Sequence, residues 1–321
     1  MNVLAALAAA LSLVGRHGTL LAALSIFIGL ALPGLAALLK PALGAVIVAM
    51  LMLAFLRVDP AALRRYFTRP GLIAAAAVWL MLIAPAATGA AFFYAGFGQT
   101  MPGLYFILVL QLSAPGLMSA PAVAALLGLD VALTLAGLIV SVAAAPISAG
   151  LFTHLFLGTA LASPLALGLR LALIIAGSAL GATVIRRIAG GAFIDAQKLR
   201  IDGLSVLMFM TFAIAAMDGV TAHLVNEPML VGKLTLLAFA LSIGMMAVTT
   251  LVFWPAGRGR AFAIGLMAGN RNIGLMLAAT GFAVSDIAWL YFAVAQFPIY
   301  LLPHLMRPLA RWATKPASGQ R

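Results

Sequence analysis

Residues 266–280, LMAGNRNIGLMLAAT, place Asn270, Arg271 and Asn272 in a row inside an otherwise apolar stretch. Sixty-five per cent of the 321 residues are hydrophobic and 8% are charged, whereas a soluble domain carries about 25% charged residues. Most of the chain therefore cannot face water, and the sequence predicts an all-α integral membrane protein. An arginine deep inside a membrane-embedded segment then needs a physical explanation.

Apolar runs long enough to cross a bilayer, about 20 residues each, follow one another between polar boundaries. They predict about ten transmembrane helices, at residues 18–38, 40–56, 70–93, 104–127, 130–155, 163–185, 204–224, 228–255, 261–282 and 286–307. The first apolar run, before Arg16, is short for a span and lacks the basic start of a signal peptide. We expect it to form a helix at the membrane surface.

Basic residues gather in alternate connections between these predicted spans. They are Arg16; Arg57, Arg64, Arg65 and Arg69; Arg186, Arg187, Lys198 and Arg200; Arg258 and Arg260; and Arg307, Arg311, Lys315 and Arg321. The other connections carry almost none, with Lys40 and Lys233 as exceptions near helix ends. Because positive charges are retained on the cytoplasmic side, we predict a multi-pass protein of the cell (inner) membrane with both termini cytoplasmic. The net charge of +12 is scattered, so it does not indicate a nucleic-acid partner.

The predicted spans form two groups of five. A duplicated repeat with an odd number of spans must insert its second copy upside down. We therefore expect two inverted five-helix repeats, residues 1–158 with the surface helix and residues 159–310, followed by a cytoplasmic tail at 311–321. Each group contains an interrupted span, the fourth by SAPGLMSAP (113–121) and the ninth by AGNRNIG (268–274). Helix starts follow at Asp130 and Asp286, which resemble N-caps.

The interruption of the fourth span contains Pro115, Gly116 and Pro121, which an unbroken helix accommodates poorly. A plain proline kink is one explanation. Matched breaks in both halves favour another, in which broken helices four and nine cross at the midplane. Half-helix ends then direct their dipoles at a bound ligand.

Arg271 lies deep in the ninth span, where a cation costs at least about 2.5–3.5 kcal/mol. Three compensations are open: an internal carboxylate, carbonyls at the ends of the broken helices, or a bound anion. Asp218 is the intramembrane acid to test as a partner, although its place in the outer third of span seven favours a wetted position. With Asn270 and Asn272 beside it, the guanidinium suits recognition of a carboxylate. The alternative is that the three residues only join span nine to its neighbours.

Other chemistry is sparse in the sequence. The chain has no cysteine, its four histidines are far apart, and its serines lack a nearby base. We therefore expect no metal site, no cofactor and no enzymatic activity. Gly265 and Gly269 form a small-xxx-small pattern that is typical of helix contacts.

The order of these features resembles the bile acid:sodium symporter family. The resemblance covers residues 16–310 and rests on two motifs. SAPGLMSAPAVAALLGLDVALTLAGLIVSVAAAPI (113–147) is similar to the broken fourth helix and the fifth helix of that family, and MAGNRNIGLMLA (267–278) is similar to its broken ninth helix. The resemblance implies ten helices in two inverted repeats, a panel domain and a core domain. It also implies alternating-access transport of organic anions, often with sodium.

The chain departs from the family at the sodium-site residues. Where the family's ninth helix has Glu-x-Gly-x-Gln-Asn, Met267 replaces the sodium-binding glutamate and Arg271 replaces the glutamine. Ala120 and Pro121 stand at the family's Ser-Asn pair, Leu138 at a threonine, and Leu80, five residues before Pro85, at a third-helix glutamine, while Thr134 and Ser141 remain hydroxyls. Removing an acid and adding a fixed cation makes the site repulsive for sodium.

The favoured hypothesis is a secondary transporter of a small organic anion that is not coupled through the usual two-sodium site. Its expected substrate-binding residues are Asn270, Arg271, Asn272, Pro115, Gly116, Ser119 and Gly269. One alternative is a sodium- or proton-coupled symporter with rearranged ligands, for which Thr134, Ser141 and Asp218 are candidate ion-coupling residues. Another is a non-transporting membrane sensor or partner subunit that kept the fold.

Overall fold

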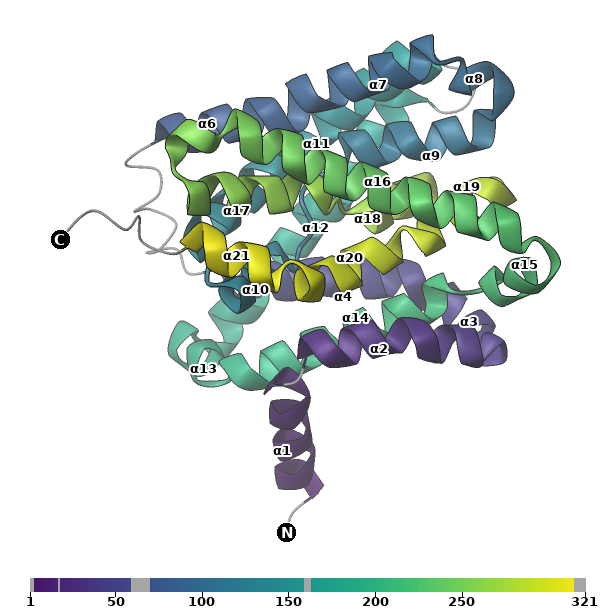
Figure 1. The fold of residues 1–321 in the computed structure, drawn as a ribbon. Coiled ribbons are helices and arrows are strands. Elements are labelled where there is room, and N and C mark those ends of the chain that lie inside the picture. Colours follow the sequence, from purple (N-terminus) through teal and green to yellow (C-terminus); the bar gives the residue numbers. More distant parts are fainter. Residues whose placement is uncertain (1–2, 17, 59–69, 159–162, 315–321) are drawn as a thin grey trace. The chain divides into compact units, whose positions relative to one another are not determined.

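The computed structural model of the chain describes residues 3–16, 18–58, 70–158 and 163–314, and these ranges contain helices and no β-strand (Figure 1). Seven helical segments in these ranges are long and apolar enough to cross a membrane: Pro33–Leu56, Gly71–Tyr94, Val131–Leu157, Pro164–Ala189, Lys198–Asn226, Pro228–Val252 and Asp286–Leu305. The expected all-α multi-pass membrane protein is therefore confirmed. Ten spans and an inverted repeat stay predictions. His17, Arg64, Arg65, Arg69, Lys315 and Arg321 lie outside the described residues.

Contacts divide the chain into two compact units. Unit 1 contains residues 1–58, 169–235 and 274–300, and unit 2 contains residues 59–168, 236–273 and 301–321. Each unit draws on both halves of the sequence. The two units are defined by residue contacts and do not correspond to the two predicted repeats. The repeat boundary after residue 158 stays a prediction.

Unit 1 is organised around α14 (Lys198–Ala216). Its other elements are α1 (Val3–Arg16), α2 (Gly18–Ala31), α3 (Pro33–Leu39), η1 (Lys40–Ala42), α4 (Leu43–Leu56), most of α12 (Pro164–Ala189), α13 (Gly191–Ala196), α15 (Val220–Asn226), nearly all of α18 (Ile273–Thr280), α19 (Asp286–Val294) and the first parts of α16 (Pro228–Val252) and α20 (Gln296–Leu305). Helix α14 lies against α1, α2, α3 and α4 (Figure 1). The 19 residues of α14 extend over about 28 Å, close to the ~30 Å of a bilayer's hydrocarbon core.

The boundary between the first two predicted spans, which lies in unit 1, differs from the expected one. The sequence places a boundary between spans at residues 38–40, but α2 ends at Ala31 and α3 begins at Pro33. Proline has no N–H and therefore cannot continue the hydrogen bonding of α2. Lys40 instead begins a single 3-10 turn inside the apolar segment Pro33–Leu56.

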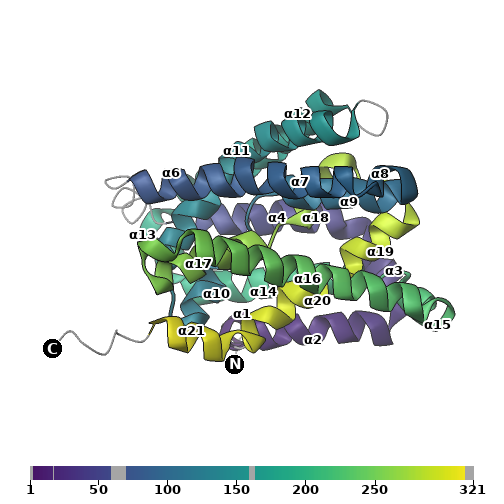
Figure 2. The ribbon, with the colours of Figure 1, turned by 45° about the horizontal axis from the view of Figure 1, so that its top comes forward.

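Unit 2 holds both helix interruptions. Its elements are α6 (Pro70–Val78), the π-helical η2 (Trp79–Ile83), α7 (Ala84–Tyr94), α8 (Phe97–Thr100), α9 (Pro102–Ser113), α10 (Ala120–Leu127), α11 (Val131–Leu157), η3 (Trp254–Ala256), α17 (Arg258–Gly269), α21 (Arg307–Thr314), the start of α12 and the later parts of α16 and α20. Helix α9 packs against α7 and α11, and α17 packs against α11 and α21 (Figure 2). The predicted breaks are confirmed, one between α9 and α10 and one between α17 and α18.

The two acids expected at helix starts differ in their outcome. Asp130 is the N-cap of α11, and its Oδ1 accepts a hydrogen bond from the Leu133 N–H at 2.9 Å. The N-cap assignment of Asp286 was wrong by one position, because Ser285 is the N-cap and Asp286 begins the first turn of α19. A carboxylate in that turn still opposes the positive end of the helix dipole.

Candidate functional site

The two helix interruptions contact each other directly in unit 2. The Leu117 N–H donates to the Asn270 carbonyl at 3.0 Å, and the Asn272 N–H donates to the Pro115 carbonyl at 2.9 Å. Gly116 and Arg271 thereby form an isolated antiparallel bridge. Backbone groups that the breaks release from helical bonding thus satisfy one another, as buried backbone must. The predicted crossing of the two interruptions is confirmed, and its depth in a membrane stays a prediction.

Helix α11 holds this crossing in place through Ser141. The Ser141 hydroxyl accepts from the Gly116 N–H at 3.2 Å and donates to the Leu138 carbonyl at 2.9 Å. The Ser141 side chain is fully buried. Its two polar functions are therefore used to position the break, which makes it a positioning residue for the crossing.

Arg271 is buried at the crossing, with 3% of its surface exposed. Its guanidinium donates to backbone carbonyls of three separate segments: Nε to Ala268 at 3.1 Å, Nη1 to Ala114 at 3.0 Å and Nη2 to Leu80 at 2.9 Å. Nη1 also lies 3.9 Å from the Met81 sulfur. Of the three compensations that the sequence left open, helix-end carbonyls are the one found here.

A helix interruption leaves each of these carbonyls available. In a continuous helix the Ala268 carbonyl would accept from the Asn272 N–H, which bonds to Pro115 instead. Ala114 is the C-cap of α9, where helical bonding ends. Leu80 lies in the π-helical turn, where the Ala84 N–H bonds to Trp79 and Pro85 has no N–H for Leu80.

The carbonyls solvate the guanidinium but do not neutralise it. Carbonyl groups carry dipoles and no net charge, so the formal +1 of Arg271 remains at the crossing. Among the described residues no acid forms an ion pair with Arg271. The one acid described in unit 2 is Asp130, which caps α11.

Asn270 provides a second unusual group at the crossing. Its side-chain Nδ2 donates to the Leu266 carbonyl at 3.0 Å, and its Oδ1 has no hydrogen-bond partner among the described residues. The residue is 3% exposed. A buried acceptor without a partner costs about 1–3 kcal/mol, so Oδ1 is a position where a ligand's donor would be stabilised.

Gly269 and Met267 lie in closely packed positions near the crossing. A Cβ on Gly269 would collide with the Ser242 carbonyl of α16, and one on Gly265 would approach the Met246 carbonyl to 2.7 Å. The predicted helix-contact role of the glycine pair is therefore confirmed. The Met267 methyl lies 3.3 Å from where a Gly116 Cβ would be, so an apolar side chain packs where the family resemblance expects a carboxylate.

The hydroxyls of Thr134 and Ser119 lie in the same unit. Thr134 donates within α11, to the Val131 carbonyl at 2.7 Å. Ser119 is the half-buried N-cap residue of α10 and makes no side-chain capping bond. In the first turn of α10 the Ala120 N–H donates to the Leu117 carbonyl and the Val123 N–H donates to the Ser119 carbonyl, and Pro121 has no N–H, so these three positions offer no free donor.

Asp218 lies in unit 1 and pairs with Lys40. The Lys40 ammonium is 2.8 Å from Asp218 Oδ2 and 4.2 Å from the Trp289 ring centre. Both residues line a cavity of about 180 Å³ together with His223 and Phe282. The Asp218 side chain is 23% exposed, which supports the expected wetted position.

Sequence reasoning included helix-end carbonyls as a possibility but missed which carbonyls bind Arg271, and it missed the π-helical turn that supplies Leu80, because backbone groups leave no direct signature in the side-chain sequence. Pro85 was the available signal, since a proline frees the carbonyls of the preceding turn. Among the described residues, no three His, Asp or Glu side chains come close enough to hold a metal ion. No protein-family model and no curated protein sequence matches the chain.

Proposed function

We propose that this protein is a secondary transporter that carries a small organic anion by alternating access, without a coupled sodium ion. The observation that carries the proposal is the Arg271 charge, which is buried among carbonyls and lacks an acidic partner among the described residues. A cation in this state attracts an anion, because a bound carboxylate supplies the neutralisation that the described residues of unit 2 do not.

Neighbouring groups support recognition of more than charge. The half-buried Ser119 hydroxyl, which makes no capping bond, offers a donor to an anion. Asn270 Oδ1 offers a buried acceptor to a hydroxyl or N–H on the same ligand. Pro115, Gly116, Gly269 and Asn272 act through backbone geometry, because they form or support the crossing itself.

The same geometry supports independence from sodium. Carbonyl oxygens from broken helices are common ligands of transported cations. Here the cation that these carbonyls bind is the guanidinium of Arg271, which is covalently attached to the chain. Met267 packs its apolar side chain against Gly116, a residue of the crossing. Arg271 thus takes the place of a coupling ion and stays bound through every transport cycle.

Matched interruptions, each followed by a new helix start, support two inverted repeats that move against each other. In unit 1, Arg57 and Lys40 lie at opposite ends of α4, and the Arg57 end is the more basic. By the positive-inside rule we assign this end to the cytoplasm and the protein to the cell membrane.

Counterflow into proteoliposomes tests the proposal. Liposomes loaded with unlabelled lactate, pyruvate, acetate or taurocholate are diluted into the labelled anion. We expect accumulation of at least one label with the wild type and with Arg258→Ala, an exposed arginine outside the crossing. Arg271→Ala should reduce it to background. Equal accumulation by Arg271→Ala would refute the role of this charge.

Coupling through rearranged ligands is the alternative. Asn270 Oδ1 favours it, because an unpaired buried oxygen is also a cation ligand. It predicts that sodium raises the melting temperature of the wild type, whereas the tethered-cation proposal predicts no change beyond that caused by equal potassium.

A further inference from the structure

One end of unit 1 combines the last residues of α4 and α12 with α13 and the start of α14, and it is strongly basic. It carries the cations Arg57, Arg186, Arg187, Lys198 and Arg200 and the acids Asp195 and Asp202. Five cations against two acids leave a net charge of +3. We call this group the basic end.

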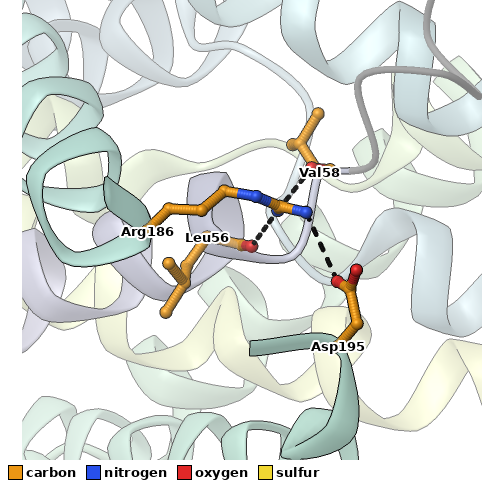
Figure 3. Close-up of polar contacts among 4 residues, drawn as sticks. All are labelled: Leu56, Val58, Arg186 and Asp195. Carbon is orange, nitrogen blue, oxygen red and sulfur yellow. Dashed lines mark hydrogen bonds and ion pairs between the residues drawn. The ribbon is translucent and has the colours of Figure 1, made fainter. Parts of the chain in front are cut away.

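Both acids are already paired with arginines that hold helices together. Figure 3 shows Arg186 between two elements: its Nη2 lies 3.3 Å from Asp195, and its Nη1 donates to the Leu56 and Val58 carbonyls at 3.1 and 3.2 Å. A second arginine, at position 57, lies 2.9 Å from the other acid, at position 202. These two arginines have structural roles at the end of α4.

The remaining three cations have no acidic partner in the described part of the chain. Arg187, Lys198 and Arg200 are all exposed. Arg200 donates to the side-chain oxygen of Gln197, which is neutral. The basic end therefore presents three uncompensated positive charges at its surface.

Helix α13 places an apolar side chain among these charges. Ile194 is 6% exposed and packs with Leu56 and Ala182, which anchors the short helix to α4 and α12. Phe193, its neighbour, is 57% exposed, and Ile188 at the end of α12 is 81% exposed. Exposed apolar side chains beside unpaired cations are typical of segments at the interface between lipid headgroups and acyl chains.

We propose that the basic end binds an anionic phospholipid. Arg187, Lys198 and Arg200 contact the phosphate headgroup, and Phe193 enters the acyl region. Free phosphate offers the same charge but no acyl chain, so the exposed phenylalanine favours the lipid. The proposal is independent of what the protein transports.

Thermal unfolding of the purified full chain in neutral detergent, titrated with phosphatidylglycerol or phosphatidylcholine, tests this. We expect phosphatidylglycerol alone to raise the melting temperature of the wild type. Arg187→Gln should need roughly fivefold more lipid for half of the effect, and the triple variant with Lys198→Gln and Arg200→Gln roughly a hundredfold more. Lys233→Gln, an exposed cation of unit 1 outside the basic end, is the matched control and should leave the midpoint unchanged.

Three results would overturn the proposal: equal stabilisation by phosphatidylcholine, an unchanged midpoint in the triple variant, or full stabilisation by glycerol phosphate at the same phosphate concentration. If the triple variant does not fold, the salt dependence of the wild type decides. Screening should raise the lipid concentration needed, and a midpoint that is insensitive to salt would contradict headgroup binding.

Discussion

Replacing Arg271 by methionine is expected to destabilise the protein, although it removes a charge from an apolar interior. The substitution leaves the Leu80, Ala114 and Ala268 carbonyls without their donor. Three orphaned carbonyls at about 2 kcal/mol each, offset by about 3 kcal/mol for no longer burying the cation, leave a net loss of about 3 kcal/mol. Methionine is long and unbranched, so the cavity contribution is small.

The measurement is the free energy of unfolding in mixed micelles, followed by tryptophan fluorescence. Trp79 lies in the π-helical turn next to Leu80, and its Nε1 donates to Thr249 at 2.9 Å, so its emission reports on this region. Arg57→Met, which removes a partly buried arginine of unit 1 and its ion pair with Asp202, is the control and should lose about 1 kcal/mol or less. An Arg271→Met variant as stable as the wild type would refute the account of the carbonyls.

Chemical rescue sharpens the same prediction. Arg271→Ala leaves a space lined by the three carbonyls, which free guanidinium fits by charge and shape. At about ten times its dissociation constant, guanidinium should stabilise this variant by about 1.4 kcal/mol and leave the wild type unchanged at the same millimolar concentration. Urea at that concentration is the neutral control. Equal effects of urea and guanidinium would show that no cation site remains.

Four further substitutions test the geometry. Alanine at Gly269 should lower the free energy of unfolding by more than about 2 kcal/mol, because its Cβ meets a backbone oxygen of α16. Alanine at Gly116 meets a flexible methionine methyl and should lower it by less than about 1 kcal/mol. Equal melting temperatures of the two variants would contradict this order. Alanine at Pro85 restores an N–H that competes with Arg271 for the Leu80 carbonyl. In a double-mutant cycle, its effect on the free energy of unfolding should therefore be less than additive with loss of the guanidinium. Strict additivity would count against the competition. Alanine at Arg186 removes the donor to the Leu56 carbonyl at the end of α4 and to the Val58 carbonyl just beyond it. It should cost about 1–2 kcal/mol and speed amide exchange at the end of α4. An unchanged exchange rate would contradict the capping role.

Composition predicted the fold class, and proline placement predicted the interruption between α9 and α10, because apolar run length and missing N–H groups act locally along the chain. The interruption between α17 and α18 was predicted from the polar and glycine residues of AGNRNIG (268–274). The burial of Arg271 was predictable because it lies within a long apolar run. The partners of its guanidinium were not, since they are backbone carbonyls from three segments far apart in sequence. Only the folded arrangement brings Leu80, Ala114 and Ala268 together.

Boundaries at polar residues were less predictable than breaks at prolines. Lys40 marks the end of an apolar run, yet the helical break lies at Leu32 before Pro33. A lysine at a helix end can remain within the helix and pair, as Lys40 does with Asp218, whereas a proline cannot supply the missing hydrogen bond. Asp286 was placed one residue from the N-cap because Ser285 and Asp286 are adjacent and both residue types are common at this position.

The sodium dependence of anion counterflow tests the central claim most directly. Initial rates are measured for the wild type in proteoliposomes with sodium or choline as the main cation on both sides. A tethered guanidinium that replaces the coupling ion predicts equal rates in the two media. A rate that falls to background without sodium would contradict it.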